Sequence, residues 1–167
     1  DFSKNVKTRL DTVKSSGIIG LFLLLLSLYL FLNLRVAFIT AFGIPVSFLV
    51  AAFGMYILGF TINMVSLFAF LVALGMIVDD AIIVTENTYR HIENGMDPAL
   101  AAKIGPKEVF WPIIASTFTT IAAFLPMFSI SGTLGKFIEV IPVVVTVALL
   151  GSLMEAFVVL PSHCASF

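Results

Sequence analysis

Two adjacent aspartates, Asp79 and Asp80, lie inside an apolar stretch that is long enough to cross a membrane. The stretch runs from Asn63 to Glu86 and contains no basic residue that could pair with them. A charged side chain near the middle of a bilayer costs about 2.5–3.5 kcal/mol on insertion scales. At least one of the two carboxyl groups should therefore hold a proton at neutral pH unless a cation is supplied from elsewhere. The pair predicts a site that moves protons, ions or substrate; a polar pair that only stabilises a helix bundle is the alternative.

Helical geometry separates the two aspartates and gives each its own face. Neighbouring residues on a helix point about 100° apart, so Asp79 shares a face with Gly75 and, two turns later, with Glu86. Gly75 would let another helix approach closely. The polar line from Gly75 through Asp79 and Glu86 to Glu93 predicts a proton path to one membrane surface, provided that a water-lined crevice completes it.

Hydroxyl side chains in a later apolar span are candidate supporting groups. Ser116, Thr117, Thr119 and Thr120 could relay protons or donate hydrogen bonds to the site. Hydroxyls in membrane helices more often bond to their own backbone. Thr119 and Thr120 are therefore weaker candidates than the aspartates.

The composition independently indicates a membrane protein. The chain is 60% hydrophobic and only 11% charged, whereas soluble domains are about 25% charged. A net charge of −1 gives no basic surface for nucleic acid. The single cysteine, Cys164, excludes a disulfide within the chain, and no His or Cys spacing suits a zinc site. We expect no metal, no cofactor and no catalytic residue.

Five hydrophobic spans are long enough to cross a hydrocarbon core, which takes about 20 helical residues. They cover approximately residues 17–34, 37–58, 64–85, 109–130 and 137–160. The sequence therefore predicts an all-α bundle of about five transmembrane helices over residues 17–167. Residues 1–16 have an amphipathic spacing, and we interpret them as a surface segment or the tail of a missing extramembrane domain.

Few acidic residues fall within these spans, and none of the nine basic residues does. Besides the aspartate pair, only Glu139 and Glu155 do so, and both lie near span ends, where we expect water or headgroups to reach them. Basic residues number five on the face that holds the N-terminus and four on the opposite face. That difference leaves the orientation undecided.

Short connections predict antiparallel neighbours, with turns at Asn33, at residues 59–63 and at residues 131–136. In the longer third connection, Asn94-Gly95 indicates a helix end. Asp97 followed by Pro98 indicates the start of a short surface helix, which we expect Gly105-Pro106 to end before the fourth span.

The chain resembles the resistance-nodulation-division (RND) efflux transporters, most closely their hydrophobe/amphiphile efflux branch. The resemblance covers essentially the whole chain, as helices two to six of the N-terminal half. It is carried by Gly75-Met-Ile-Val-Asp79-Asp80-Ala-Ile-Ile-Val-Thr-Glu86-Asn87, Glu93-Asn-Gly-Met-Asp-Pro-Ala, Gly105-Pro-Lys-Glu-Val-Phe-Trp-Pro, Ala122-Ala-Phe-Leu-Pro126, Ser131-Gly132 and Glu155-Ala-Phe-Val-Val-Leu-Pro-Ser-His163.

The resemblance implies a multi-pass, proton-driven multidrug antiporter of the bacterial inner membrane, whose parent works as a homotrimer. Asp79 and Asp80 would take up and release protons opposite a lysine of the C-terminal half. That half and the periplasmic domains are outside this sequence. Its partners would be the lipid bilayer and the remaining half of the transporter, or a second copy of the chain. The family topology places residues 1–16 on the periplasmic face.

Three other functions remain to be weighed. A non-transporting membrane scaffold or assembly module would suit the isolated chain. Another RND-like exporter, of metals or lipids, would share the helices. An intramembrane aspartyl protease is disfavoured, because its two aspartates must face one scissile bond, whereas adjacent residues on one helix diverge.

Overall fold

Helices make up nearly all of the computed structural model, which describes residues 2–31, 34–61 and 63–165 and contains no strand in these ranges. The first four helices are α1 (Phe2–Phe31), α2 (Leu34–Ile57), α3 (Met64–Glu93) and α4 (Pro98–Phe124). A 3₁₀ turn, η1 (Leu125–Ser129), and the short helix α5 (Gly132–Ile138) lead into a final rod made of α6 (Val140–Met154), the π-helical turn η2 (Glu155–Val159) and α7 (Leu160–Cys164). The predicted all-α membrane bundle is confirmed.

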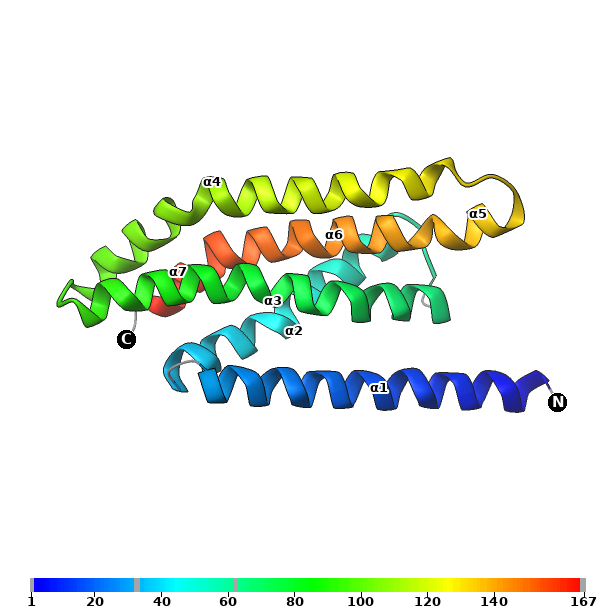
Figure 1. Ribbon diagram of the computed structural model, residues 1–167, viewed down its shortest axis with the longest axis horizontal. Coiled ribbons are helices and arrows are strands. Elements are labelled where there is room, and N and C mark those ends of the chain that lie inside the picture. Colours follow the sequence, from blue (N-terminus) through cyan, green and yellow to red (C-terminus); the bar gives the residue numbers. More distant parts are fainter. Residues whose placement is uncertain (1, 32–33, 62, 166–167) are drawn as a thin grey trace.

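The long helices run antiparallel to their neighbours in the chain, and the two termini lie at opposite ends of the bundle (Figure 1). Four segments are long and apolar enough to cross a membrane: Thr40–Ile57, Met64–Glu93, Pro98–Ser129 and Gly132–Ser162. Within α1 the described apolar stretch is shorter, Lys14–Ser27. The predicted turn at Asn33 lies outside the described residues. Helix α1 runs without a break through residue 16, and a division of the chain there stays a prediction.

Local sequence signals set the ends of α3. Asn63 adopts an extended conformation, and its side chain accepts hydrogen bonds from the backbone of Val65 and Ser66, while the Ser66 hydroxyl accepts one from the backbone N–H of Asn63. This reciprocal capping box satisfies N–H groups that no helical turn can reach. At the other end Gly95 has φ +88°, a conformation that glycine adopts without steric cost. The predicted helix end at Asn94-Gly95 is confirmed.

Helix α4 differs from the prediction. Asp97 caps it as expected, with its carboxylate accepting from the backbone N–H of Leu100, but the helix continues through Gly105 and Pro106 into the membrane span. The expectation of a separate short surface helix was wrong. The helix continues here because it packs closely on α3. Gly105 lies against Thr88 of α3, and a Cβ on Gly105 would come within 2.7 Å of the Thr88 Cα. Figure 1 shows α4 bent in its first half, as expected of a helix with internal prolines.

Helix α3 is the central helix and packs against α2, α4 and α6. Ala69 and Ala73 of α3 and Ala148 of α6 are fully buried in the main core cluster. In lipid, helices associate through van der Waals packing because there is no hydrophobic driving force between them, and small residues let them approach closely enough to pack. The bundle is therefore held together mainly around α3, the helix that carries both aspartates.

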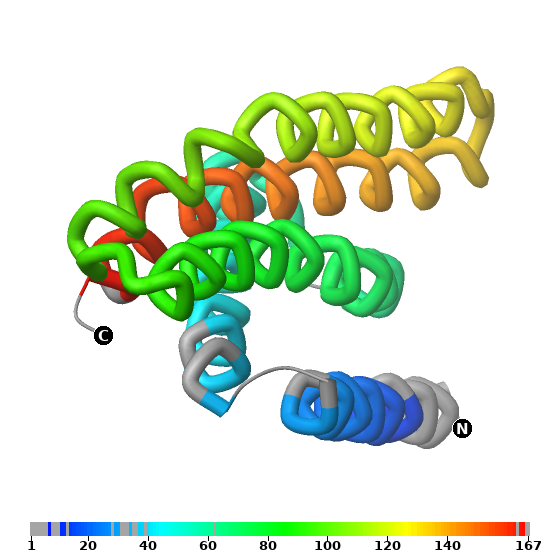
Figure 2. Tube along the Cα trace, turned by 60° about the vertical axis from the view of Figure 1, so that its left-hand side comes forward, coloured from blue at the N-terminus to red at the C-terminus, as the bar shows by residue number. Residues whose placement is uncertain are grey.

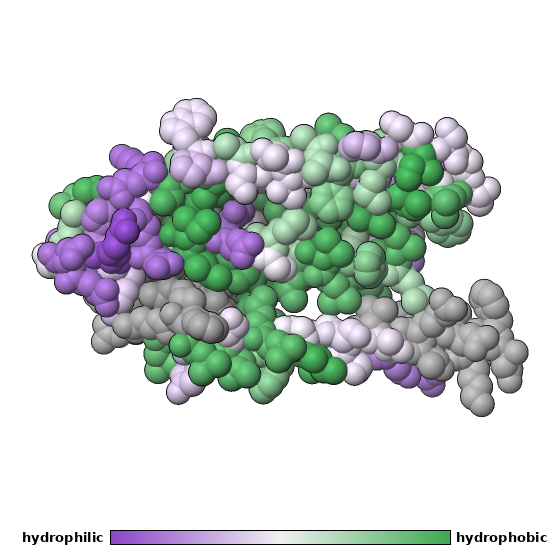
Figure 3. Space-filling model, in the orientation of Figure 1, coloured by the Kyte–Doolittle hydropathy of each residue, from purple (hydrophilic) through white to green (hydrophobic). Residues whose placement is uncertain are grey.

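Polar side chains gather at the end of the bundle where α3 meets α4 (Figure 3). The Asn87 amide donates to the Gly105 carbonyl (2.9 Å) and to the Glu108 carboxylate (2.8 Å). His91 lies 2.8 Å from the same carboxylate oxygen, and Arg90 donates to the Asn87 side chain at 2.7 Å. These bonds connect the two helices at one end of the bundle.

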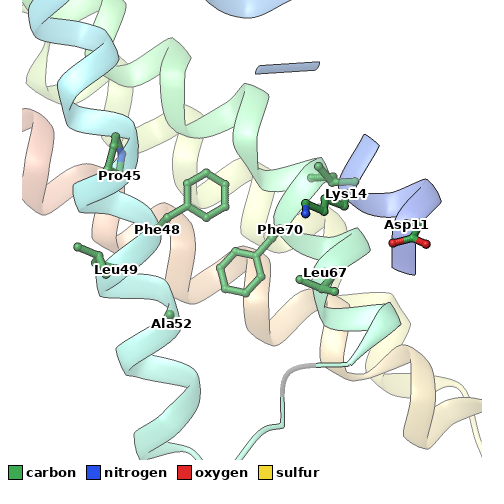
Figure 4. A pocket seen from close by; sticks show the side chains of 9 residues that line it. Asp11, Lys14, Pro45, Phe48, Leu49, Ala52, Leu67 and Phe70 are labelled. Carbon is green, nitrogen blue, oxygen red and sulfur yellow. The ribbon is translucent and has the colours of Figure 1, made fainter. Parts of the chain in front are cut away.

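Helix α1 lies at the edge of the bundle (Figures 1 and 2). A pocket of about 840 Å³ separates it from α2 and α3. Its walls are mostly apolar and include the rings of Phe48 and Phe70, whose centroids are 5.4 Å apart. Asp11 and Lys14 line the pocket on the α1 side (Figure 4). Helix α1 packs against α2 and α3.

We predict that Gly105→Ala destabilises the bundle. The added methyl group would overlap the backbone of Thr88, and overpacking of this kind costs about 1–3 kcal/mol. Thermal unfolding in detergent should show a lower midpoint. The matched variant Gly20→Ala adds a methyl group with no neighbour within 4 Å and should leave the midpoint unchanged or raise it. Equal midpoints for the two variants would contradict the close α3–α4 approach.

Candidate functional site

The two aspartates occupy different environments, although they are neighbours on α3. Asp80 is only 6% exposed and faces α6. Asp79 is exposed, on a face of α3 that the described helices do not cover. The two carboxyl groups therefore diverge as helical geometry predicts. That of Asp80 lies inside the bundle, and that of Asp79 lies at its surface.

Ser152 of α6 is the side chain that contacts Asp80. Its Oγ lies 3.3 Å from Asp80 Oδ2 and 3.0 Å from the carbonyl oxygen of Ile77. A serine hydroxyl is both a donor and an acceptor. It can therefore donate to an ionised Asp80, or donate to the Ile77 carbonyl while it accepts a bond from a protonated Asp80. The contact suits either protonation state.

Both aspartates also line one pocket of about 470 Å³ between α3 and α4. The wall on the α4 side consists of Val109, Pro112, Ile113 and Ser116. Water or a partner side chain that enters this pocket would therefore lie beside both residues, and of the two only Asp79 is exposed.

The predicted polar line is present as one exposed face of α3. Gly75, Asp79, Glu86 and Glu93 are all exposed, and a Cβ on Gly75 would meet nothing within 4 Å. Glu86 lines a separate pocket of about 340 Å³ with Arg90 among its walls. The face is therefore open along its length, and a close helix approach at Gly75 stays a prediction.

The structure does not bring the two candidate threonines to the aspartates. The Thr119 hydroxyl donates to the Ala115 carbonyl at 2.7 Å, and that of Thr120 donates to the Ser116 carbonyl at 3.0 Å. Neither lines the pocket that the aspartates share. Ser116 is the α4 hydroxyl that does.

Two residues of this region were missed from the sequence. Ser152 follows Gly151 inside an apolar span, and this pair of small residues is the local signal for a close helix contact there. Glu155 was expected near a span end, within reach of water. That expectation was wrong, because the rod continues through η2 and α7, and Glu155 is 2% exposed. Glu139 is exposed as expected.

The described side chains provide no cation for the aspartates. The ion pair found among them joins His91 and Glu108, at the end of the bundle. Within the described ranges, no three His, Cys, Asp or Glu side chains are grouped as a metal site would require. In this part of the chain, the polar side chains beside the carboxyl pair are the hydroxyl groups of Ser152 and Ser116.

Comparison with known proteins gives a consistent result. The model of the AcrB/AcrD/AcrF family matches residues 1–167. The chain is 37% identical over 166 residues to the multidrug resistance protein MdtC of Pantoea ananatis, covering 99% of this chain and 16% of that protein. It is 36% identical over 165 residues to MdtC of Escherichia coli, covering 98% of this chain and 16% of that protein. The chain thus spans about one sixth of the length of these relatives.

We predict that the two aspartates differ in reactivity. An apolar carbodiimide, such as dicyclohexylcarbodiimide, should modify Asp79 of the detergent-solubilised chain well before Asp80, because Asp80 is covered by α6. Mass spectrometry of the peptide that contains both residues would locate the adduct, with Asp79→Asn as the control that should lose most of it. Faster labelling of Asp80 would contradict the described burial.

Proposed function

The chain belongs to the AcrB/AcrD/AcrF family, and we propose that it forms part of the membrane domain of a proton-driven multidrug exporter. In this proposal Asp79 and Asp80 carry the protons. The observation that supports this proposal most strongly is the pair of adjacent carboxyl groups on the central helix, one buried against Ser152 and one at an open face. The names of the relatives suggest multidrug resistance as the parent protein's role.

Proton transport requires that a carboxyl group change environment during the cycle. A nearby cation favours the ionised form, whereas a dry apolar environment favours the protonated form. The open face of α3 at Asp79 is where a cationic side chain from the rest of the transporter would pack. Approach and withdrawal of that cation would let the pair release a proton on one side of the membrane and bind one from the other.

The two aspartates have different roles in this scheme. Asp79 meets the cation directly, since it lies at the uncovered face. Asp80 stays in contact with α6 through Ser152 and so transmits its protonation state to the rest of the bundle. The pair shares one pocket, and its two protons form a coupled titration that belongs to both residues.

We propose the bacterial inner membrane as the location and a homotrimer as the assembly of the parent protein. Within each subunit, the exposed face of α3 would be covered by the other half of the membrane domain. Gly75 lies on this face and would allow a close approach. The energy source would be the proton gradient, so that no bound cofactor is needed.

We predict that Asp79→Asn, Asp80→Asn and the double variant of the full-length transporter lose efflux. Asparagine keeps the shape and hydrogen bonding of aspartate and removes the titratable proton, so that folding and membrane insertion should survive. Drug efflux from cells should fall to the level of a strain without the transporter, at equal protein abundance. Glu139→Gln, which changes an exposed acid, is the matched control and should keep efflux. Parent efflux rates with intact proton coupling in all three variants would contradict the proposal.

We also predict that the 167-residue chain does not transport when it is reconstituted alone in vesicles. The reason is that no cationic side chain among the described residues lies beside the aspartates, and no described helix covers the exposed face of α3. A pH gradient should drive no drug accumulation, whereas the full-length transporter in parallel vesicles should show it. Drug–proton antiport by the chain alone would contradict this prediction, and equal inactivity of both samples would contradict the exporter function itself.

A further inference from the structure

Glu155 is a second buried carboxyl group of the bundle, on a different helix from the aspartates. It is 2% exposed and begins the π-helical turn η2, in which the backbone N–H of Leu160 bonds to the Glu155 carbonyl. Single π-helical turns inside α-helices occur frequently at functional sites. The turn directs the Glu155 side chain toward α2.

The carboxyl group of Glu155 occupies a space that only glycine leaves open. A Cβ built on Gly43 of α2 would overlap the carboxyl oxygen Oε1 and would lie 2.7 Å from Cδ. Thr40 and Ser47 lie about one turn before and after Gly43, on the same buried face of α2. This part of α2 thus presents a glycine gap between two hydroxyl groups to the carboxyl group.

Three polar atoms at this helix contact lack hydrogen bonds. Glu155 Oε2, Thr40 Oγ1 and Ser47 Oγ are buried and have no partner among the described residues. Most buried polar side chains in proteins do have partners. An ionised Glu155 here would be a buried charge whose hydrogen-bonding capacity is unmet, which is the least favourable state of a carboxyl group in an apolar environment.

Among the described side chains of the helices that pack against η2, the cationic groups are Arg90 and His91, and these bond to Asn87 and Glu108. The buried titratable groups on these helices are the Asp80 carboxyl group on α3 and the Cys164 thiol on α7. Helix α6 has no titratable side chain, and the polar side chains described as buried on α2 are those of Thr40 and Ser47. A proton is therefore the cation that can neutralise Glu155 within this part of the chain.

A short path connects Glu155 to the aspartate pair. Ser152, which contacts Asp80 at 3.3 Å, lies one turn before Glu155 on the same rod. Gly151 lies beside it and packs against Val50 and the Ser47 carbonyl of α2. A movement of α2 relative to η2 would therefore shift the hydroxyl group that holds Asp80.

We propose that Glu155 is a further proton-binding residue of the membrane domain, which couples the packing of α2 on η2 to the environment of Asp80. The coupling rests on the proposed proton relay at Asp79 and Asp80. Glu155 binds one proton from water and later returns it, with no other bond made or broken. In its neutral form it packs in the gap at Gly43. In its ionised form it draws the hydroxyl groups of Thr40 and Ser47 toward itself and so moves α2 and Ser152.

Infrared difference spectroscopy of the full-length transporter, comparing acid with alkaline pH, tests the proton-binding role. The parent should show a carboxylic C=O band that Glu155→Gln loses and that the matched control Glu139→Gln keeps. The Asp79→Asn/Asp80→Asn double variant should also keep it, so that the result does not depend on the proposed relay. A Glu155→Gln spectrum identical to that of the parent would overturn the proposal.

A second variant leaves the carboxyl group in place. Gly43→Ala fills the gap, so that in the folded transporter the Glu155 band should shift in frequency and the Asp80 band should shift with it. Gly20→Ala, which adds a methyl group in open space, should shift neither. A Gly43→Ala spectrum that matches the parent would overturn the contact with α2. A shift of the Glu155 band alone would overturn the coupling to Asp80.

Discussion

A carboxyl group inside a bilayer must be covered by protein, neutralised by a proton or paired with a cation, and the arrangement around α3 follows from this constraint. Asp80 meets it through burial against α6 and contact with Ser152. Asp79, on the exposed face of α3, meets it either by binding a proton or through a contact with something outside residues 1–167. The same helix thus has one face suited to a permanent contact and another suited to a contact that changes.

The packing of the bundle supports this division. Alanines and glycines bring α2, α3 and α6 close together, and the polar cluster of Asn87, Glu108 and His91 connects α3 to α4 at one end. Helix α3 is therefore held on three sides while its fourth side stays open. A helix held in this way keeps its aspartates at the boundary between the bundle and whatever covers the open face, which is the position that the proposed relay requires.

The sequence predicted features that depend on local chemistry, and it failed where distant residues decide the outcome. The Asp97–Pro98 helix start and the Asn94–Gly95 helix end are set by capping and by glycine, so they could be predicted. The continuation of α4 through Pro106 depends on Thr88, and the burial of Glu155 depends on Gly43, neither of which is near in sequence. The Ser152–Asp80 contact joins residues 72 positions apart. Helical periodicity predicts which face of α3 carries Asp80, but it does not predict that Ser152 lies beside it.

The most direct test is the structure of the full-length transporter in lipid nanodiscs by electron cryomicroscopy, at a resolution that shows side chains. Our account predicts a cationic side chain from outside residues 1–167 within hydrogen-bond distance of the Asp79 carboxylate, with Asp80 still in contact with Ser152. An Asp79 carboxyl group surrounded by lipid acyl chains, with no polar side chain beside it, would contradict the account.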